Sequence, residues 1–350
     1  MTSPVQVGSE DGVAGTSMET AGARWHVLAL LSAFMGFAWI STDFYLPVMP
    51  DMAAQLGADA GSIEYTISGF LIGFSLGQLL WGSVSDKYGR RIPVAIGLVL
   101  FIIGSIGCAT SGFVQTIIFW RILQALGACA GVVLARAMVR DLYQGPRAAQ
   151  MLSTLIAVMA IAPLLAPILG GQIAAIGGWR WIFWTLVALG SLLLAGMFTL
   201  PETLPVERRR TDPLSSAFKR YAQLLPHRKI LGYAGTGAFF YAGMYAYIAG
   251  TRFAFITYHG VPSENYGLLF GAGIVATNLI NARLVHRFGM NRIMFAGTTI
   301  ATVSGLVLAV NSYSDFGGLW GLFIPMLVFV SATGLIVANS IVGAMADYPE

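Results

Sequence analysis

Two long apolar runs of this sequence are joined by the short charged segment Gly82-Ser83-Val84-Ser85-Asp86-Lys87-Tyr88-Gly89-Arg90-Arg91. The runs cover residues 63–84 and 93–112, and each can cross the ~30 Å hydrocarbon core of a bilayer as a helix. Gly82 and Gly89 suit close approach and a sharp turn. Asp86, with cations beyond it, suits a charge network between helices. Simple anchoring of the cations at the cytoplasmic surface would explain the arginines, but neither the glycines nor Asp86.

Composition extends this pattern to the whole chain. Of the 350 residues, 56% are hydrophobic and only 10% are charged, and the mean hydropathy is +0.73. Soluble domains carry about 25% charged residues, so most of this surface must face lipid. The apolar runs are 25–47, 63–84, 93–112, 115–138, 150–175, 180–200, 230–257, 264–284, 292–311 and 319–344. We therefore predict an all-α polytopic membrane protein.

The cations are distributed unevenly along the chain. Most Lys and Arg residues lie in the N-terminal flank or in alternate loops, whereas the other loops hold Arg180 alone together with several acids. Short cytoplasmic loops carry such an excess of Lys and Arg. The distribution predicts that the N-terminus and the C-terminus as given are both cytoplasmic. The net charge of +4 is therefore no sign of nucleic-acid binding.

The polar stretch 201–229 divides the chain. We predict a disordered cytoplasmic tail (1–24), an N-terminal six-helix bundle (25–200), a cytoplasmic linker (201–229) and an incomplete four-span bundle (230–350). A weak repeat supports two related halves, because Lys87-Tyr88-Gly89 recurs as Arg287-Phe288-Gly289. Parallel repeats of this kind build many transporters. With six spans followed by four, we expect a final helical hairpin to be missing.

Asp43 is the acidic residue that lies well inside an apolar run. A carboxylate is costly in hydrocarbon and usually marks an ion or proton pathway. Arg121 is expected at similar depth on another run, which makes it the natural partner of Asp43. Two structural alternatives stay open: Asp43 could cap or bend the end of its helix, and Arg121 could form a fixed ion pair without a role in transport.

Arg252 should lie at nearly the depth of Asp43 and Arg121. If it faces a cavity, the excess of cations should favour neutral, zwitterionic or anionic substrates. Alternatively, Arg252 reaches outward to lipid headgroups or pairs with Glu264.

The run 150–175 contains Pro163, Pro167, Gly170 and Gly171. Two prolines four residues apart and a glycine pair weaken the helical hydrogen bonds, and permit kinking and close packing. The sequence shows no metal-ligand cluster, nucleotide-phosphate loop or nucleophile–base pair. We therefore expect no enzyme, no metal and no cofactor, with a proton gradient as the driving force.

Several motifs resemble one family. Residues 82–91 resemble the signature loop of the major facilitator superfamily, residues 121–127 its fourth-helix motif, and residues 166–171 its antiporter motif. Residues 41–50, 135–143, 161–171, 179–184 and 201–204 look like the branch of drug:proton antiporters that confers bicyclomycin and chloramphenicol resistance.

The resemblance implies a two-bundle fold of twelve spans that exports small drugs across the inner membrane against proton entry, by alternating access and as a monomer. Asp43 would be the protonation switch and Arg121 its modulator. The implied assignments of other residues are a cytoplasmic latch of Gly82, Asp86, Gly89, Arg90, Arg91 and Asp141, an antiporter motif of Pro163, Pro167, Gly170 and Gly171, and a substrate cavity with Tyr45, Gln124 and Arg252.

Two departures from the family pattern keep alternatives open. The eleventh helix, which the family's signature-loop aspartate faces, is absent here, and Thr251-Arg252 stands where a small residue and a proline are usual. The chain could instead be a truncated, non-transporting remnant or a sensor, or a proton-coupled importer of the same fold.

Overall fold

The structure is a computed structural model that describes residues 11–143, 145–213, 215–224, 226–252 and 276–345, the last without 278–279, 282 and 286. For some helical residues, 11–24, 156–164 and 248–252 among them, only the backbone is described. The described residues form helices and loops and contain no strand. The α-helices are α1 (Asp11–Asp43), α2 (Met49–Leu56), α3 (Ala60–Tyr88), α4 (Arg91–Thr110), α5 (Val114–Leu142), α6 (Gly145–Gly177), α7 (Trp179–Met197), α8 (Ser215–Leu224), α9 (Arg228–Arg252), α11 (Met290–Ser314), α12 (Gly318–Ser331) and α13 (Thr333–Met345), with 3-10 helices η1 (Leu46–Val48) and η2 (Val206–Arg208).

Seven stretches of the described chain are long and apolar enough to cross a membrane. They are Trp25–Leu56, Gly61–Tyr88, Arg91–Thr110, Val114–Leu142, Trp179–Met197, Met290–Ser314 and Gly318–Ala344, and each matches a predicted run. The runs 150–175 and 230–257 are helical as α6 and α9, but they are not among these seven. The run 264–284 lies largely outside the described residues. The division into six and four spans, with a missing hairpin, stays a prediction.

The chain divides into two compact units, Met1–Asp212 and Pro213–Glu350, and the boundary lies inside the predicted linker. The structure differs from the sequence prediction near the N-terminus. Residues 1–24 were expected to be disordered, but α1 already begins at Asp11. The physical reason is that extending an existing helix fixes one residue per new hydrogen bond, whereas starting a helix is costly.

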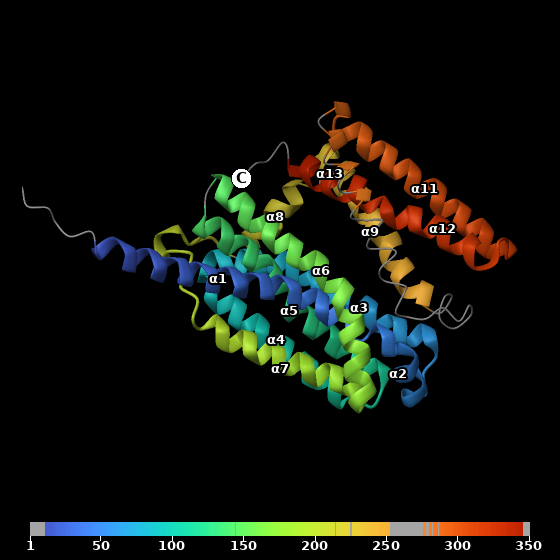
Figure 1. Cartoon of the computed structure of the whole chain (residues 1–350), viewed down its shortest axis with the longest axis horizontal. Helices are drawn as coiled ribbons and strands as arrows, with labels where there is room; N and C mark the ends of the chain where they lie inside the picture. The colour runs from blue at the N-terminus through green and yellow to red at the C-terminus, as the bar shows by residue number, and fades with distance from the viewer. Residues whose placement is uncertain are drawn as a thin grey trace, which may run out of the picture. The chain divides into compact units, whose positions relative to one another are not determined.

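Helix α5 is the centre of the first unit, since α1, α3, α4 and α6 all pack against it, while α7 packs on α4 (Figure 1). Helices α3 and α5 pack closely against each other. A Cβ added at Gly73 would lie 2.1 Å from the Ile122 carbonyl oxygen, and one at Gly77 would lie 2.7 Å from Cys129 Cβ. Small residues at four-residue spacing let membrane helices approach in this way.

Helix α1 is interrupted at its C-terminal end. It ends at Asp43, passes through Phe44 and Tyr45 and continues as η1 and α2. Pro47 lacks the N–H that would bond to the Asp43 carbonyl in a continuing helix, which explains why the helix stops there. The break leaves the last carbonyls of α1 without partners in their own helix.

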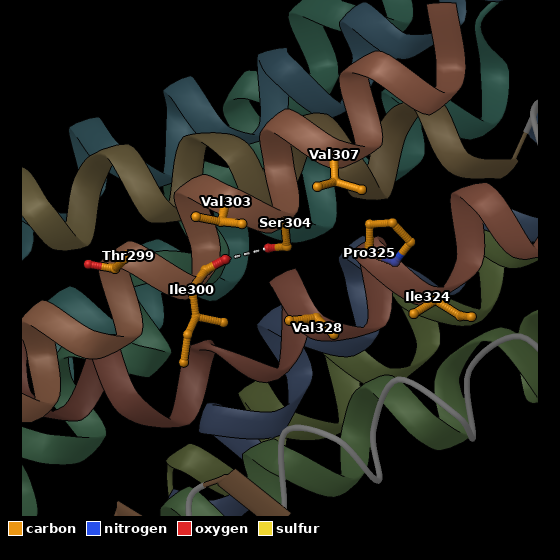
Figure 2. A pocket seen from close by; sticks show the side chains of 8 residues that line it. All are labelled: Thr299, Ile300, Val303, Ser304, Val307, Ile324, Pro325 and Val328. Atoms are coloured by element: carbon orange, nitrogen blue, oxygen red, sulfur yellow. Dashed lines mark hydrogen bonds between the residues drawn. The ribbon is translucent and has the colours of Figure 1, made fainter. Parts of the chain in front are cut away.

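The second unit has α11 packed on α12 and α13, and α9 packed on α13. Phe240, Ala301, Ala332 and Ile336 form one of its buried clusters. A cavity of about 430 Å³ lies between α11 and α12 (Figure 2). Val303, Val307, Ile324 and Val328 line it with apolar groups.

Candidate functional site

The side chain of Arg121 is completely buried in the first unit, at the broken end of α1. Its Nη1 donates hydrogen bonds to the Ser41 carbonyl oxygen (3.0 Å) and to Gln124 Oε1 (2.6 Å). In an unbroken helix the Ser41 carbonyl would accept from residue 45 instead. A cation at the C-terminal end of a helix is stabilised by the helix dipole and by the last carbonyls. The break in α1 thus creates the position that Arg121 occupies.

Two aromatic rings hold the same guanidinium group. The Arg121 Cζ lies 4.3 Å from the ring centroid of Tyr45 and 4.3 Å from that of Phe70. Cation–π contacts of this kind gain strength where water is excluded. The Tyr45 hydroxyl lies 3.2 Å from Thr66 Oγ1 on α3. Helices α3 and α5 and the segment after α1 therefore meet at one buried cation.

A buried hydrogen-bond chain continues from Arg121 into α4. Gln124 Nε2 donates to Ser105 Oγ at 2.7 Å, and Ser105 Oγ donates to the Phe101 carbonyl at 2.8 Å. Ser105 was not predicted as a site residue, because a serine in an apolar run carries no signal unless the fold brings it to a polar partner. Its bond fixes the Gln124 amide so that the amide oxygen faces Arg121.

The sequence predicts Arg121 as the partner of Asp43, a nearby cation that favours the ionised carboxylate. In the structure, the Ser41 carbonyl and the Gln124 amide accept the Nη1 hydrogen bonds, two rings cover the faces of the guanidinium group, and Nε and Nη2 have no hydrogen-bond partner among the described residues. The pairing with Asp43 stays a prediction. Asp43, the last residue of α1, is half-buried and lies two residues beyond the carbonyl that Arg121 binds.

Tyr45 and Gln124 were assigned to a substrate cavity. The structure buries both side chains completely, against Arg121. Arg252 is the last residue of α9, and its side chain lies outside the described part of the structure. The cavity assignments of these residues stay predictions.

The loop after α3 forms a second site, in which one arginine joins three helices. Arg90 Nη1 lies 2.8 Å from Asp86 at the end of α3, and Arg90 Nε lies 2.8 Å from Asp141 at the end of α5. Arg90 itself precedes α4. Although burial alone would lower the pKa of Arg90, its pKa is raised because both carboxylates accept hydrogen bonds from it. Arg91 points elsewhere, and its Nη2 donates to the Phe198 carbonyl at 3.0 Å.

Glu202, from the linker, completes this cluster and was not singled out from the sequence. Its carboxylate accepts from the backbone N–H of Arg90 (2.8 Å), Arg91 (3.3 Å) and Leu204 (3.0 Å). It therefore occupies the positive N-terminal end of α4. Burial would raise the pKa of Glu202, but these N–H groups and the nearby Arg209 lower it. The sequence showed a carboxylate in the motif at residues 201–204, but it did not indicate which groups this carboxylate would bind.

The two loop glycines differ. Gly89 has a φ of +88°, and a Cβ there would lie 2.6 Å from Glu202 Oε2, so the predicted turn is present. At Gly82, no described atom lies within 4 Å of an added Cβ. The close approach expected at Gly82 is therefore absent from the described residues, because its Cβ position points away from the neighbours that bury Trp81 and Ser85.

The antiporter-motif residues all lie in α6. A Cβ at Gly170 would lie 1.9 Å from the Phe44 carbonyl oxygen, whereas one at Gly171 would meet no described atom within 4 Å. Pro167 is half-buried, and only the backbone of Pro163 is described. The motif thus meets α1 at the residue that follows Asp43.

The remaining described features offer no other chemistry. Both cysteines, Cys108 and Cys129, are buried and free. Among the described residues, no group of three or more His, Cys, Asp or Glu side chains could hold a metal ion.

Two hydroxyl-bearing residues, Thr299 and Ser304, line the cavity between α11 and α12 (Figure 2). Both hydroxyl groups bond back to carbonyls of their own helix, those of Phe295 and Ile300. The cavity therefore offers no proton-carrying group.

The comparison with known proteins places these sites in a family. Residues 28–350 match the family model described as Major Facilitator Superfamily. The chain belongs to the major facilitator superfamily. It is a multi-pass membrane protein of that superfamily, with several apolar helices.

Two relatives and one solved structure illustrate the match. The chain is 34% identical to YdgK of Bacillus subtilis, an uncharacterized MFS-type transporter, over 87% of this chain and 77% of YdgK. It is 28% identical to the bicyclomycin resistance protein homolog of Haemophilus influenzae, over 92% and 81% of the two chains. The xylose transporter XylE of E. coli, in a partially occluded inward-open conformation, has the same fold, with a TM-score of 0.70, 17% identity, and coverage of 92% and 86%. The resemblance to the drug-efflux branch is confirmed.

Proposed function

We propose that this protein exports small drugs, of the bicyclomycin and chloramphenicol type, across the inner membrane in exchange for protons. It would work by alternating access, as a monomer, with the N- and C-termini of this chain in the cytoplasm. The relative named for bicyclomycin resistance supports the substrate class. One observation supports the proton coupling most strongly, namely the buried Arg121 on the last turn of α1, which ends in Asp43.

The charge state of Asp43 would control this end of α1. A carbonyl, an amide and two rings stabilise the guanidinium group of Arg121. Protonation of Asp43 removes a negative charge close to that cation. Because the interior is of low dielectric, this change alters the local electrostatic energy far more than it would in water. A proton arriving from outside can thus change the stability of the broken helix end.

The cluster around Arg90 would be the cytoplasmic latch of the first unit. Arg90 joins the ends of α3 and α5 through Asp86 and Asp141, and Glu202 fixes the start of α4 to the linker. These ion pairs are at the helix ends, where they can form and break without exposing a buried charge to hydrocarbon. Breaking them would release the inner ends of three helices together.

The test is transport by purified protein in liposomes with an imposed pH gradient. Asp43→Asn should lose gradient-driven efflux of chloramphenicol while keeping exchange of substrate at equal pH. Glu64→Gln, a half-buried acid in the first turns of α3, is the matched control, and it should retain gradient-driven efflux. Undiminished gradient-driven efflux by Asp43→Asn would contradict the proposed proton coupling.

A further inference from the structure

The backbones of α6 and α1 touch directly at the end of α1. A Cβ placed on Gly170 would lie 1.9 Å from the carbonyl oxygen of Phe44 and 2.7 Å from its carbonyl carbon. Real Cβ atoms do not approach other atoms so closely, so any side chain at residue 170 would move one of the two backbones. Phe44 is the residue that follows Asp43, and its N–H still bonds to the Ile40 carbonyl at 3.0 Å.

Two helices, α5 and α6, contact the backbone on either side of Asp43. Arg121 of α5 donates to the Ser41 carbonyl, two residues before Asp43, while Gly170 of α6 bears on the Phe44 carbonyl, one residue after it. The Asp43 peptide is therefore fixed between two neighbours that belong to different helices. Because the helix stops here, the Ser41 carbonyl has no partner in its own helix, and these outside contacts add to the remaining helical hydrogen bonds in setting the position of Asp43.

We propose that Gly170 is a positioning residue for proton coupling, whose bare backbone lets α6 fix the location of Asp43 relative to Arg121. The proposal deepens the proposed function and rests on it. The sequence predicts kinking and close packing for this motif, but it does not indicate which residue makes the close contact or what that contact positions. At Gly170 the absence of a side chain serves close packing, and Gly171 has no comparable contact among the described atoms.

The charged and titratable groups around this turn are few in the described part of the first unit. Arg121 comes from α5, and Arg180 comes from α7, where its Nη2 donates to the Ser111 carbonyl. The charged residue of α6, Arg147, is in the first turn of that helix, far from Gly170. The remaining groups are Tyr45 and Asp51 after α1 and Glu64 on α3. Of these, Arg121 is the cation bonded to the Asp43 turn, so a displacement of the turn changes chiefly the distance between Asp43 and Arg121.

The experiment compares Gly170→Ala with Gly171→Ala in the full chain. Both substitutions add one methyl group and raise the helix propensity by the same amount. Only the first places that methyl group against Phe44. The readout is labelling of Asp43 by a hydrophobic carbodiimide, which reacts with the protonated carboxyl group, measured by peptide mass spectrometry from pH 4 to pH 10. This measurement needs no transported substrate. Gradient-driven chloramphenicol efflux by the parent protein, measured in parallel, tests the proposed function separately.

We expect the labelling midpoint of Gly170→Ala to differ from that of the parent by about half a pH unit or more, since a changed distance to a cation alters proton affinity. Gly171→Ala should keep the midpoint of the parent. Pro167→Ala is a second variant, which restores a helical N–H one turn before Gly170 and redirects α6 without adding an atom at the contact. It should move the midpoint as well, and it decides the question if Gly170→Ala does not fold.

Three results would overturn the proposal. The first is a parent-like midpoint in both Gly170→Ala and Pro167→Ala. The second is an equal shift in Gly171→Ala, which would make the effect one of helix propensity. The third is an unfolded Gly170→Ala with a parent-like Pro167→Ala, since Gly170 would then serve folding alone.

Discussion

Removal of the Glu202 carboxylate tests how the linker stabilises the first unit where α4 begins. Glu202→Ala leaves the N–H groups of Arg90, Arg91 and Leu204 without their acceptor. Glu202→Gln keeps an acceptor oxygen but removes the negative charge. Glu207→Ala is the matched control, because Glu207 is an exposed acid in the same linker.

The magnitude follows from these contacts. Loss of a capping acceptor at a helix N-terminus costs about 1 kcal/mol, and loss of the favourable charge at the helix dipole costs about 0.5 kcal/mol. The ion pair of Glu202 with Arg209, at 3.8 Å between two partly exposed groups, adds little. We therefore expect the free energy of unfolding to fall by about 1.5 kcal/mol in Glu202→Ala and by about 0.5 kcal/mol in Glu202→Gln.

The pH dependence has a definite sign. The pKa of Glu202 is lowered in the folded protein, so its charge stabilises the fold above the ordinary carboxyl pKa of about 4.3. This stabilisation is lost as the pH falls through the lowered pKa of the folded state. The difference between the parent protein and Glu202→Gln should therefore be largest near neutral pH and should shrink below about pH 4.

The assay is reversible denaturation in detergent micelles at several pH values, followed by intrinsic fluorescence. Glu207→Ala should unfold within about 0.5 kcal/mol of the parent. If Glu202→Ala unfolds at the same denaturant concentration as Glu207→Ala, the carboxylate does not stabilise the start of α4, and the argument fails.

Two other predictions concern the latch and the buried arginine. Asp86→Ala removes the carboxylate 2.8 Å from Arg90 Nη1, so it should increase the labelling, from the cytoplasmic side, of a reporter cysteine on the inner half of α3, and unchanged labelling would contradict the latch. Arg121→Lys loses the flat group between two rings and should cost about 1–3 kcal/mol of stability and most gradient-driven efflux. Arg140→Lys, at an exposed position of the same helix, is the control and should leave stability and efflux unchanged. If the two lysine variants behave alike, the rings do not stabilise Arg121.

The sequence could predict the seven apolar helices that match predicted runs, and the family, because these depend on local composition and local motifs. Apolar runs of sufficient length must be helices in a bilayer, where every backbone group needs a partner within its own segment. The ion pairs of the charged loop 82–91 could likewise be predicted from its residues, and Arg90 does lie between Asp86 and Asp141. These partners could be proposed because each is at the end of an apolar run, on the same predicted side of the membrane.

The tertiary structure decided which atoms meet. Charge and depth indicated Arg121 as a functional cation near Asp43. Only the fold shows that the break in α1 offers Arg121 the Ser41 carbonyl, and that α3 and α4 bring Phe70 and, through Gln124, Ser105 to the same place. Glu202 is far along the chain from the helix start that it caps. Gly170 and Gly171 are equivalent in the sequence, and only the packing of α6 on α1 makes one of them a contact. Composition determines which segments enter the membrane, whereas backbone carbonyls, rings and glycines acquire their roles only through neighbours that the fold supplies.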